Sequence, residues 1–338
     1  MKKRVVYFDF LNIVSAFCVI ALHCNGMVHY YTDGWGWKQA LLVEVFGYWP
    51  VPIFLMLSGA TLMGYRERYS TKDFFKKRFL RTAIPFVLWS LINAVINGVD
   101  FAALGVRGVI NNITCTAFEN VYWFFPVLFS VYFAIPVVSL LKDNRKILWY
   151  MVGGAFAFCS VLPIVFNWLG LWWNNSLEMV VVGGFLIFPI LGYLLSTQDF
   201  KKSYRIALYI AAFACAVFRY VMVLKMSTAD GATNRTYFDY LGFYSVILAV
   251  GVFVFAKNST IIDKMGQNDK LVKIIKAVSG CSFGVYLIHM ILLNHILIKI
   301  FPRDCLEWRV IGPFIVYLLA VAIVFVIRKI PVVNKIIP

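Results

Sequence analysis

Charged side chains are scarce in this sequence, and acidic ones are the scarcest. Of its 338 residues only 14% are charged, whereas 62% are hydrophobic. A soluble domain of this length would be about half apolar and about a quarter charged. Because the apolar excess extends along the whole chain, the composition argues against a soluble globular protein and predicts an integral membrane protein.

Several short motifs are missing as well. The seven cysteines form no C-x-x-C pair and no metal-ligand spacing. His29 and His295 each lie six residues from another histidine, on a different helix face, so they form no metal-binding pair. No G-x-x-x-x-G-K-[ST] loop is present. We therefore predict no metal centre and no P-loop nucleotide site.

The basic excess raises the question of nucleic acid. The formal net charge is +16, from 32 Lys and Arg against 16 Asp and Glu. These basic residues stand in short loops between apolar runs, which is how membrane orientation is set. No soluble basic segment exists that could carry a nucleic-acid interface. We expect membrane lipids around the protein and no nucleic acid as a partner.

Apolar runs long enough to cross a bilayer recur along the chain. A span needs about 20 mainly apolar residues, and the first run lacks the short core and the cleavage site of a signal peptide. The sequence predicts an all-α integral membrane protein with a single domain, 1–338, and no appended soluble domain. About ten transmembrane helices are expected, at residues 5–24, 39–63, 79–97, 121–141, 147–168, 178–196, 206–224, 238–256, 278–298 and 309–327.

The distribution of Lys and Arg predicts how these helices are oriented. With the N-terminus in the cytoplasm, the cytoplasmic segments hold 24 of the basic residues and the outer segments hold 7, while Arg219 lies inside a span. Short cytoplasmic loops are enriched in Lys and Arg. We therefore place both termini in the cytoplasm and the protein in the plasma (inner) membrane as a multi-pass protein.

Polar residues interrupt the first predicted helix. At 100° per residue, Asp9, Asn12 and His23 fall on nearly one face, and Asn12 and His23 are separated by a rise of about 16 Å. Ionisable groups inside a span are costly and usually line a cavity or a pathway. The helix is therefore expected to form one wall of an elongated site.

Three further polar side chains lie inside predicted spans, namely Glu44, Arg219 and His289. Charged groups in lipid seek one another, so a shared polar interior is the economical explanation. We expect all three to contribute to substrate binding. A purely structural role stays open for His289.

His23 is the chemically most useful residue of the first helix. An imidazole can accept a proton from a hydroxyl or act as a transient nucleophile. Asp9, Asn12 and His23 are therefore our candidate catalytic residues. The alternative for His23 is a side chain at the membrane interface, bonded to a neighbouring helix.

Two loop regions add candidate binding residues. Arg78 and Arg81 are neighbours at the start of the third span, where with Lys77 they could grip phosphates. The plainer interpretation is a strongly basic cytoplasmic loop. Tyr122 and Trp123 open the fourth span at its outer end, where they could stack on a sugar or belong to the aromatic belt.

Several of these stretches resemble the acyltransferase-3 family of integral membrane acyltransferases. Members open with an aspartate, an arginine three residues later and a histidine after ten more. Asp9, Asn12 and His23 have the same spacing. The arginine pair of the family matches "KRFLR", and "VPIFLMLSGATLM", "YWFFPVLFSVYFAIP" and "SFGVYLIHMILL" are similar as well. The resemblance extends from Tyr7 to about Val326.

The resemblance implies transfer of an acyl group, usually acetyl from acetyl-CoA, to an acceptor hydroxyl on the outer side. The acceptor would be a cell-surface polysaccharide or a lipid-linked glycan precursor, which makes the reaction an O-acetylation. The donor phosphates would lie by Arg78 and Arg81. His23 would act as general base, and an acyl-histidine intermediate is the second option.

Asn12 departs from the family pattern, because an amide carries no positive charge. Either another cation takes its place, with Arg219 the only one inside a predicted span, or the donor is held differently, or catalysis has been lost. A non-catalytic membrane subunit is therefore one rival interpretation. The other is a transporter or flippase, which discontinuous helices and an inverted repeat would favour. We find no corresponding pair of broken spans.

Overall fold

The protein is described here by a computed structural model, which covers residues 5–177, 182–300, 305–331 and 333–337. Within those ranges the chain forms helices and loops and no β-strand. The α-helices are α1 (Val6–Cys24), α2 (Trp35–Gly47), α3 (Pro50–Leu62), α4 (Thr71–Arg78), α5 (Ile84–Ile96), α6 (Phe101–Thr114), α7 (Phe124–Val138), α8 (Arg145–Ala155), α9 (Leu162–Trp168), α10 (Ile187–Thr197), α11 (Lys202–Asp230), α12 (Phe243–Lys257), α13 (Thr260–Gly266), α14 (Asp269–Ile291) and α15 (Leu306–Ile327).

The predicted all-α membrane architecture is confirmed. In the described part of the chain, eight helical stretches are long and apolar enough to cross a membrane, and α12 with α13, bent by 48°, would make a ninth. The expected span at 178–196 falls partly outside the described residues. Its described part forms a shorter apolar helix, Gly184–Thr197. At 1.5 Å per residue this helix is about 21 Å long, less than the hydrocarbon core of about 30 Å.

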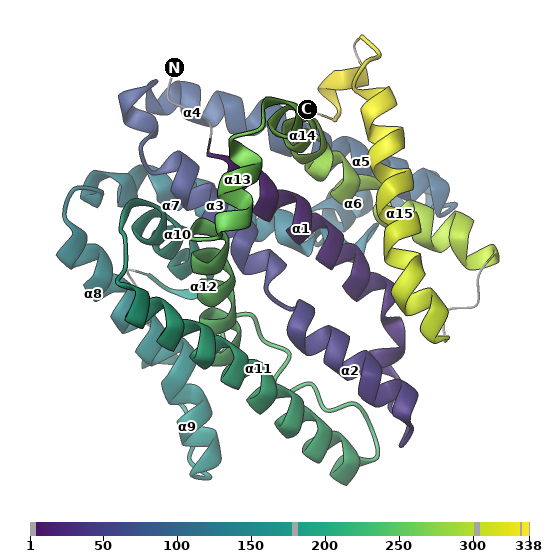
Figure 1. The fold of residues 1–338 in the computed structure, drawn as a ribbon. Coiled ribbons are helices and arrows are strands. Elements are labelled where there is room, and N and C mark those ends of the chain that lie inside the picture. The colour runs from purple at the N-terminus through teal and green to yellow at the C-terminus, as the bar shows by residue number, and fades with distance from the viewer. Residues whose placement is uncertain (1–4, 178–181, 301–304, 332, 338) are drawn as a thin grey trace.

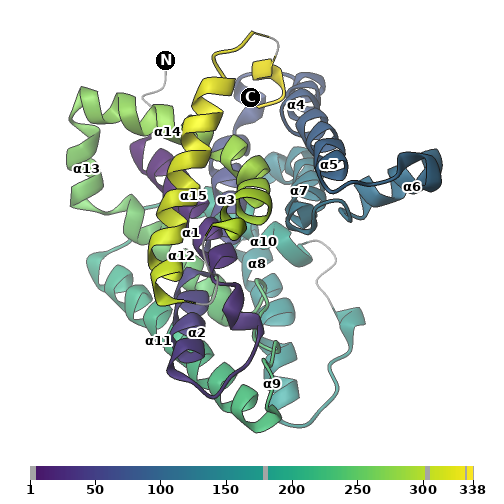
Figure 2. The same cartoon turned by 90° about the vertical axis from the view of Figure 1, so that its right-hand side faces the viewer.

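The helices pack into one bundle in which distant segments meet (Figure 1). The start of α1, the start of α14 and the end of α15 lie at the same end of the molecule, together with α4. The strongly basic loop belongs to this end, which we call the basic end. That it faces the cytoplasm stays a prediction. Helix α6 has no buried residue and projects from the bundle (Figure 2).

Prolines and capping side chains explain where several helices begin. The expected span at 39–63 is two helices, because Pro50 and Pro52 occupy the first turn of α3, where a missing N–H costs nothing. Ser70 caps α4 by accepting from the Asp73 N–H, and Asn268 caps α14 by accepting from Lys270 and Leu271. Such caps satisfy N–H groups that the first turn leaves unbonded.

Two glycines allow α3 and α10 to pack backbone to backbone. A Cβ on Gly59 would lie 1.8 Å from the Pro189 carbonyl oxygen, and a Cβ on Gly192 would lie 1.9 Å from that of Met56. Small residues permit such close approach between helices in membranes. The contact fixes α3, which forms part of the site described below.

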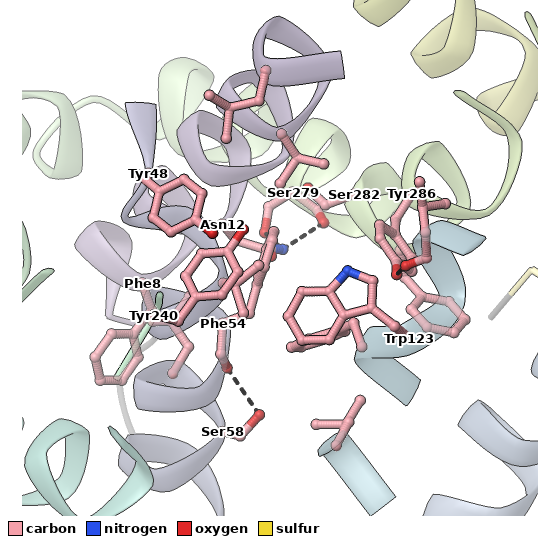
Figure 3. Close-up of a pocket in the computed structure, with 18 of the residues that line it drawn as sticks. Phe8, Asn12, Tyr48, Phe54, Ser58, Trp123, Tyr240, Ser279, Ser282 and Tyr286 are labelled. Carbon is pink, nitrogen blue, oxygen red and sulfur yellow. Dashed lines mark hydrogen bonds between the residues drawn. The ribbon is translucent and has the colours of Figure 1, made fainter. Parts of the chain in front are cut away.

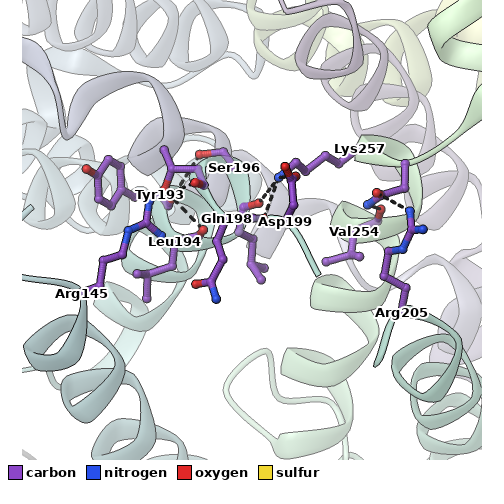
Figure 4. Close-up of polar contacts among 12 residues, drawn as sticks. Arg145, Tyr193, Leu194, Ser196, Gln198, Asp199, Arg205, Val254 and Lys257 are labelled. Carbon is purple, nitrogen blue, oxygen red and sulfur yellow. Dashed lines mark hydrogen bonds and ion pairs between the residues drawn. The ribbon is translucent and has the colours of Figure 1, made fainter. Parts of the chain in front are cut away.

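Basic side chains donate hydrogen bonds to the carbonyl groups at the C-terminal end of α10 (Figure 4). Lys257 donates to the carbonyl oxygens of Leu195 and Gln198 and pairs with Asp199 at 2.8 Å. Arg145 donates to the Thr197 carbonyl at 2.9 Å. The last carbonyls of a helix have no partner within it, so these cations stabilise the helix end as well as adding positive charge to this surface.

Candidate functional site

A cavity of about 440 Å³ lies inside the bundle, between α1, α2, α3, α7 and α14. Six of the residues predicted from sequence line it: Asp9, Asn12, His23, Glu44, Arg78 and Trp123. Asp9 and His23 are separated by fourteen residues of α1, a rise of about 21 Å. The cavity is therefore elongated along the helix, as the polar stripe on α1 indicated.

At the basic end, α1 and α14 are joined by a small hydrogen-bond network. The Asn12 amide nitrogen lies 3.0 Å from the Ser279 carbonyl oxygen and 3.1 Å from its hydroxyl oxygen. The Ser279 hydroxyl in turn donates to Asp9 at 2.8 Å. Figure 3 shows Asn12 turned towards Ser279 at the cavity wall. Ser279 was not among the predicted residues, although it links two that were.

The network fixes which way the Asn12 amide points. A carbonyl oxygen only accepts hydrogen bonds, so the NH2 group of Asn12 must face Ser279. No residue in the described ranges donates to Oδ1 of Asn12. The family pattern has an arginine at this position. Asn12 instead offers the cavity a neutral amide, whose oxygen can still accept a hydrogen bond.

Replacing Ser279 by Ala should lower the stability of the protein. The change removes one hydrogen bond to buried Asp9 and one from Asn12, and a hydrogen bond to a charged group contributes about 1.5–3 kcal/mol. Ser282, on the same helix and lining the same cavity, has no hydrogen-bond partner for its hydroxyl in the described structure. Thermal unfolding of the purified protein should therefore show a loss for Ser279→Ala and almost none for Ser282→Ala. Equal effects would mean that the network contributes no stability.

Of the three residues predicted to bind phosphates, Arg78, Arg81 and Lys77, the structure brings only the first to the cavity. Arg78 ends α4 and lines the cavity, with its guanidinium carbon 5.6 Å from the centre of the Tyr132 ring. Arg81 is exposed and does not line the cavity. It lies in a π-helical turn, Phe79–Ala83, between α4 and α5, so three-residue spacing does not put it on the face of Arg78. Lys77 is exposed too and lies over the Tyr69 ring.

If an acyl-CoA donor binds in this cavity, as the resemblance implies, Arg78→Gln should weaken its binding far more than Arg81→Gln. A lost charge-assisted contact is worth about 1.5–3 kcal/mol, or roughly a tenfold or larger rise in the dissociation constant. Arg81 stands outside the cavity, so its replacement should change the constant less than about threefold. Binding of acetyl-CoA to the purified protein would measure both. A larger effect of Arg81→Gln would place the phosphates outside this cavity.

Two histidines meet towards the other end of the cavity. The rings of His23 and His289 are 5.2 Å apart between centroids. His289 is 1% exposed, and its Nδ1 lies 2.7 Å from the Tyr286 carbonyl oxygen. Because that oxygen only accepts, Nδ1 carries the hydrogen, and Nε2 of the neutral ring is an acceptor. Nε2 has no hydrogen-bond partner in the described structure. His289 lies behind His23 and does not itself line the cavity.

Two ionisable side chains, Glu44 and Arg219, are buried near the same end. Glu44 is 5% exposed and lines the cavity, whereas Arg219 is 1% exposed and lies behind the cavity wall. Nε of Arg219 donates to the Tyr237 carbonyl at 2.7 Å, and its guanidinium carbon lies 3.9 Å from the centre of the Tyr48 ring. The two terminal nitrogens of Arg219 have no hydrogen-bond partner in the described structure.

Aromatic rings continue this cluster along the cavity. The Tyr240 ring stacks on Tyr48 at 4.1 Å and on Trp123 at 5.6 Å between centroids (Figure 3). Trp123 therefore faces the cavity as expected. Its neighbour Tyr122 does not, because its hydroxyl donates to the Leu287 carbonyl at 2.8 Å and accepts from Asn93. Tyr122 is a packing residue that joins the 3-10 turn before α7, Asn120–Trp123, to α5 and α14.

Two further side chains were missed or misjudged from the sequence. His29, beyond the end of α1, lines the cavity. Burial, followed by the nearby charge of Arg235, lowers its pKa from the ordinary histidine value. Arg219 is not the only cation inside a span, because α15 begins three residues before Arg309. Arg309 is buried and bonds to the Gly36 carbonyl of α2.

These features define a polytopic membrane protein with a cavity between its helices that carries polar and ionisable side chains. The family model of the acyltransferase domain Acyl_transf_3 matches residues 5–328. The chain therefore belongs to the acyltransferase-3 family, and it is a multi-pass membrane acyltransferase. No curated protein and no solved structure matched the chain.

Proposed function

We propose that the protein transfers an acyl group, acetyl in the first instance, from acyl-CoA in the cytoplasm to a hydroxyl on the outer side of the plasma (inner) membrane. The acceptor is a cell-surface polysaccharide or a lipid-linked glycan precursor of the cell envelope. The donor would enter at the basic end, and the acceptor would approach near His23, Glu44 and Trp123. No metal takes part in this scheme.

One observation carries the proposal. One cavity has Arg78 and the Asp9–Ser279–Asn12 network on its lining at the basic end. His23 lines it about 21 Å along α1 from Asp9, and Glu44 lines it from α2. An acyl-CoA has anionic phosphates at one end of a long arm and a thioester at the other. The length and the charge distribution of the cavity suit such a donor, so that the thioester would reach His23.

His23 is proposed as the general base. It takes the proton from the acceptor hydroxyl while the oxygen forms a bond to the thioester carbonyl carbon. The carbon–sulfur bond then breaks, and the same proton passes to the leaving thiolate, so that an ester and free CoA are produced. Attack by His23 itself, through an acyl-histidine, is the second option.

The direct test supplies membrane vesicles with acetyl-labelled acetyl-CoA on the cytoplasmic side and follows the label into the envelope glycan fraction. Base-labile label that requires the protein supports O-acetylation. Binding of acetyl-CoA without transfer to glycans would redirect the search to other acceptors. With neither binding nor transfer, the CoA-dependent scheme is wrong, and a role in transport becomes the better explanation.

A further inference from the structure

Arg328 is a cation without a partner among the residues that the structure describes. It directly follows the last residue of α15 and is half-buried. Its backbone N–H bonds to the Val324 carbonyl. No hydrogen bond or ion pair joins its guanidinium to any residue that the structure describes.

The guanidinium packs against the wall of the cavity. Nη1 of Arg328 lies 2.6 Å from the position that a Cβ on Gly280 would take. Gly280 lines the cavity next to Ser279, the residue that bonds Asp9 and Asn12. A glycine at this position allows the arginine to lie directly on the backbone of α14. A ligand that touches Gly280 would therefore be close to an unpaired positive charge.

Two ordinary roles for a basic residue at a helix end do not fit. A guanidinium that caps the helix would donate to the last carbonyls of α15, and this one makes no such bond in the described structure. A side chain that extends to lipid head groups would be exposed. Lys329, its neighbour, is exposed and lies 4.5 Å from the Phe325 ring, whereas Arg328 turns inwards.

We propose that Arg328, together with Arg78, binds the phosphates of the acyl-CoA donor. The inference rests on the proposed function. A CoA molecule carries several negative charges, and Arg81 and Asn12 do not supply positive charge to the cavity. Arg78 lines the cavity from α4. Arg328 does not line it, but packs from α15 directly on Gly280, which does, so that one ligand would be held by two helices far apart in sequence. Guanidiniums suit this role because they bind phosphates with two parallel hydrogen bonds.

The first experiment compares the dissociation constant of CoA for wild-type protein, Arg328→Gln and Lys329→Gln, each purified in lipid nanodiscs. Arg328→Gln should weaken CoA binding about tenfold, the effect of one charge-assisted contact. Lys329→Gln changes the net charge equally and should leave binding within about twofold. Equal behaviour of the two variants would overturn the inference.

A second ligand separates a phosphate contact from a general loss of structure. Pantetheine has the arm and thiol of CoA but no phosphates, so Arg328→Gln should bind it as wild type does. Weakened pantetheine binding would show that the variant is damaged elsewhere and would contradict a phosphate contact. Gly280→Ala, whose new Cβ would displace the guanidinium, should reproduce the loss for CoA. If wild type bound no CoA at all, the proposed function would fail, and this inference with it.

Discussion

His23→Ala should reduce acyl transfer at least a hundredfold while acetyl-CoA still binds. General base catalysis typically contributes a factor of about 10²–10⁴. The His23 side chain lies well beyond Asp9, Asn12 and Ser279 along α1, so the donor-binding end should remain intact. The measurement is the initial rate of label transfer from acetyl-CoA in vesicles, together with the dissociation constant of CoA for the purified variant.

His295→Ala is the matched control. His295 lies in the π-helical turn Leu292–Ile296 that follows α14 and does not line the cavity, so its loss should leave the rate within about twofold. Near-normal transfer by His23→Ala would remove this residue from the mechanism. Loss of both transfer and CoA binding would instead indicate a folding defect.

Gly59→Ala should lower the stability by about 3 kcal/mol, at the upper end of what overpacking costs. The added Cβ would stand 1.8 Å from the Pro189 carbonyl oxygen. That atom belongs to a buried backbone and not to a flexible side chain, so α3 and α10 would have to move apart. Because Phe54, Ser58 and Thr61 of α3 line the cavity, activity should fall with stability. Thermal unfolding in nanodiscs and the transfer rate would measure both effects.

A second helical glycine provides the control for this prediction. Gly153 in α8 has nothing within 4 Å of the position of a Cβ. Gly153→Ala should therefore be neutral or slightly stabilising, because alanine favours a helix by up to about 1 kcal/mol over glycine. If Gly59→Ala were tolerated equally well, the tight contact between α3 and α10 would not be needed for the fold.

The sequence predicted the fold well because lipid simplifies the problem. Hydropathy and length place most helices within a few residues, and the stripe of Asp9, Asn12 and His23 follows from helical geometry alone. The short helix at 184–197 was expected to span the bilayer. Its described residues 187–192, 194 and 195 are buried in protein, and hydropathy does not distinguish a helix surrounded by protein from one surrounded by lipid.

The candidate site was only partly predictable. Periodicity assumed a regular helix through Arg78 and Arg81, and the π-helical turn after Arg78 changes the face on which Arg81 lies. Ser279 and Tyr240 carry no signal of their own, since a serine in a span and a tyrosine in an outer loop are common. Their importance comes from contacts with residues far away in the chain, which a single sequence does not reveal.

The apolar side chains in the middle of the cavity determine whether ions could leak through the protein. Between its polar ends the lining includes large apolar side chains, among them Val19 on α1, Leu57 on α3 and Phe283 on α14. A hydrophobic stretch resists wetting and is a barrier to hydrated ions. The long arm of acyl-CoA is flexible and largely uncharged. It could therefore occupy this stretch without ions passing through the protein with it. If the proposed transfer takes place, the protein would bring a reactive acyl group to the far side of the membrane while the membrane stays impermeable to ions.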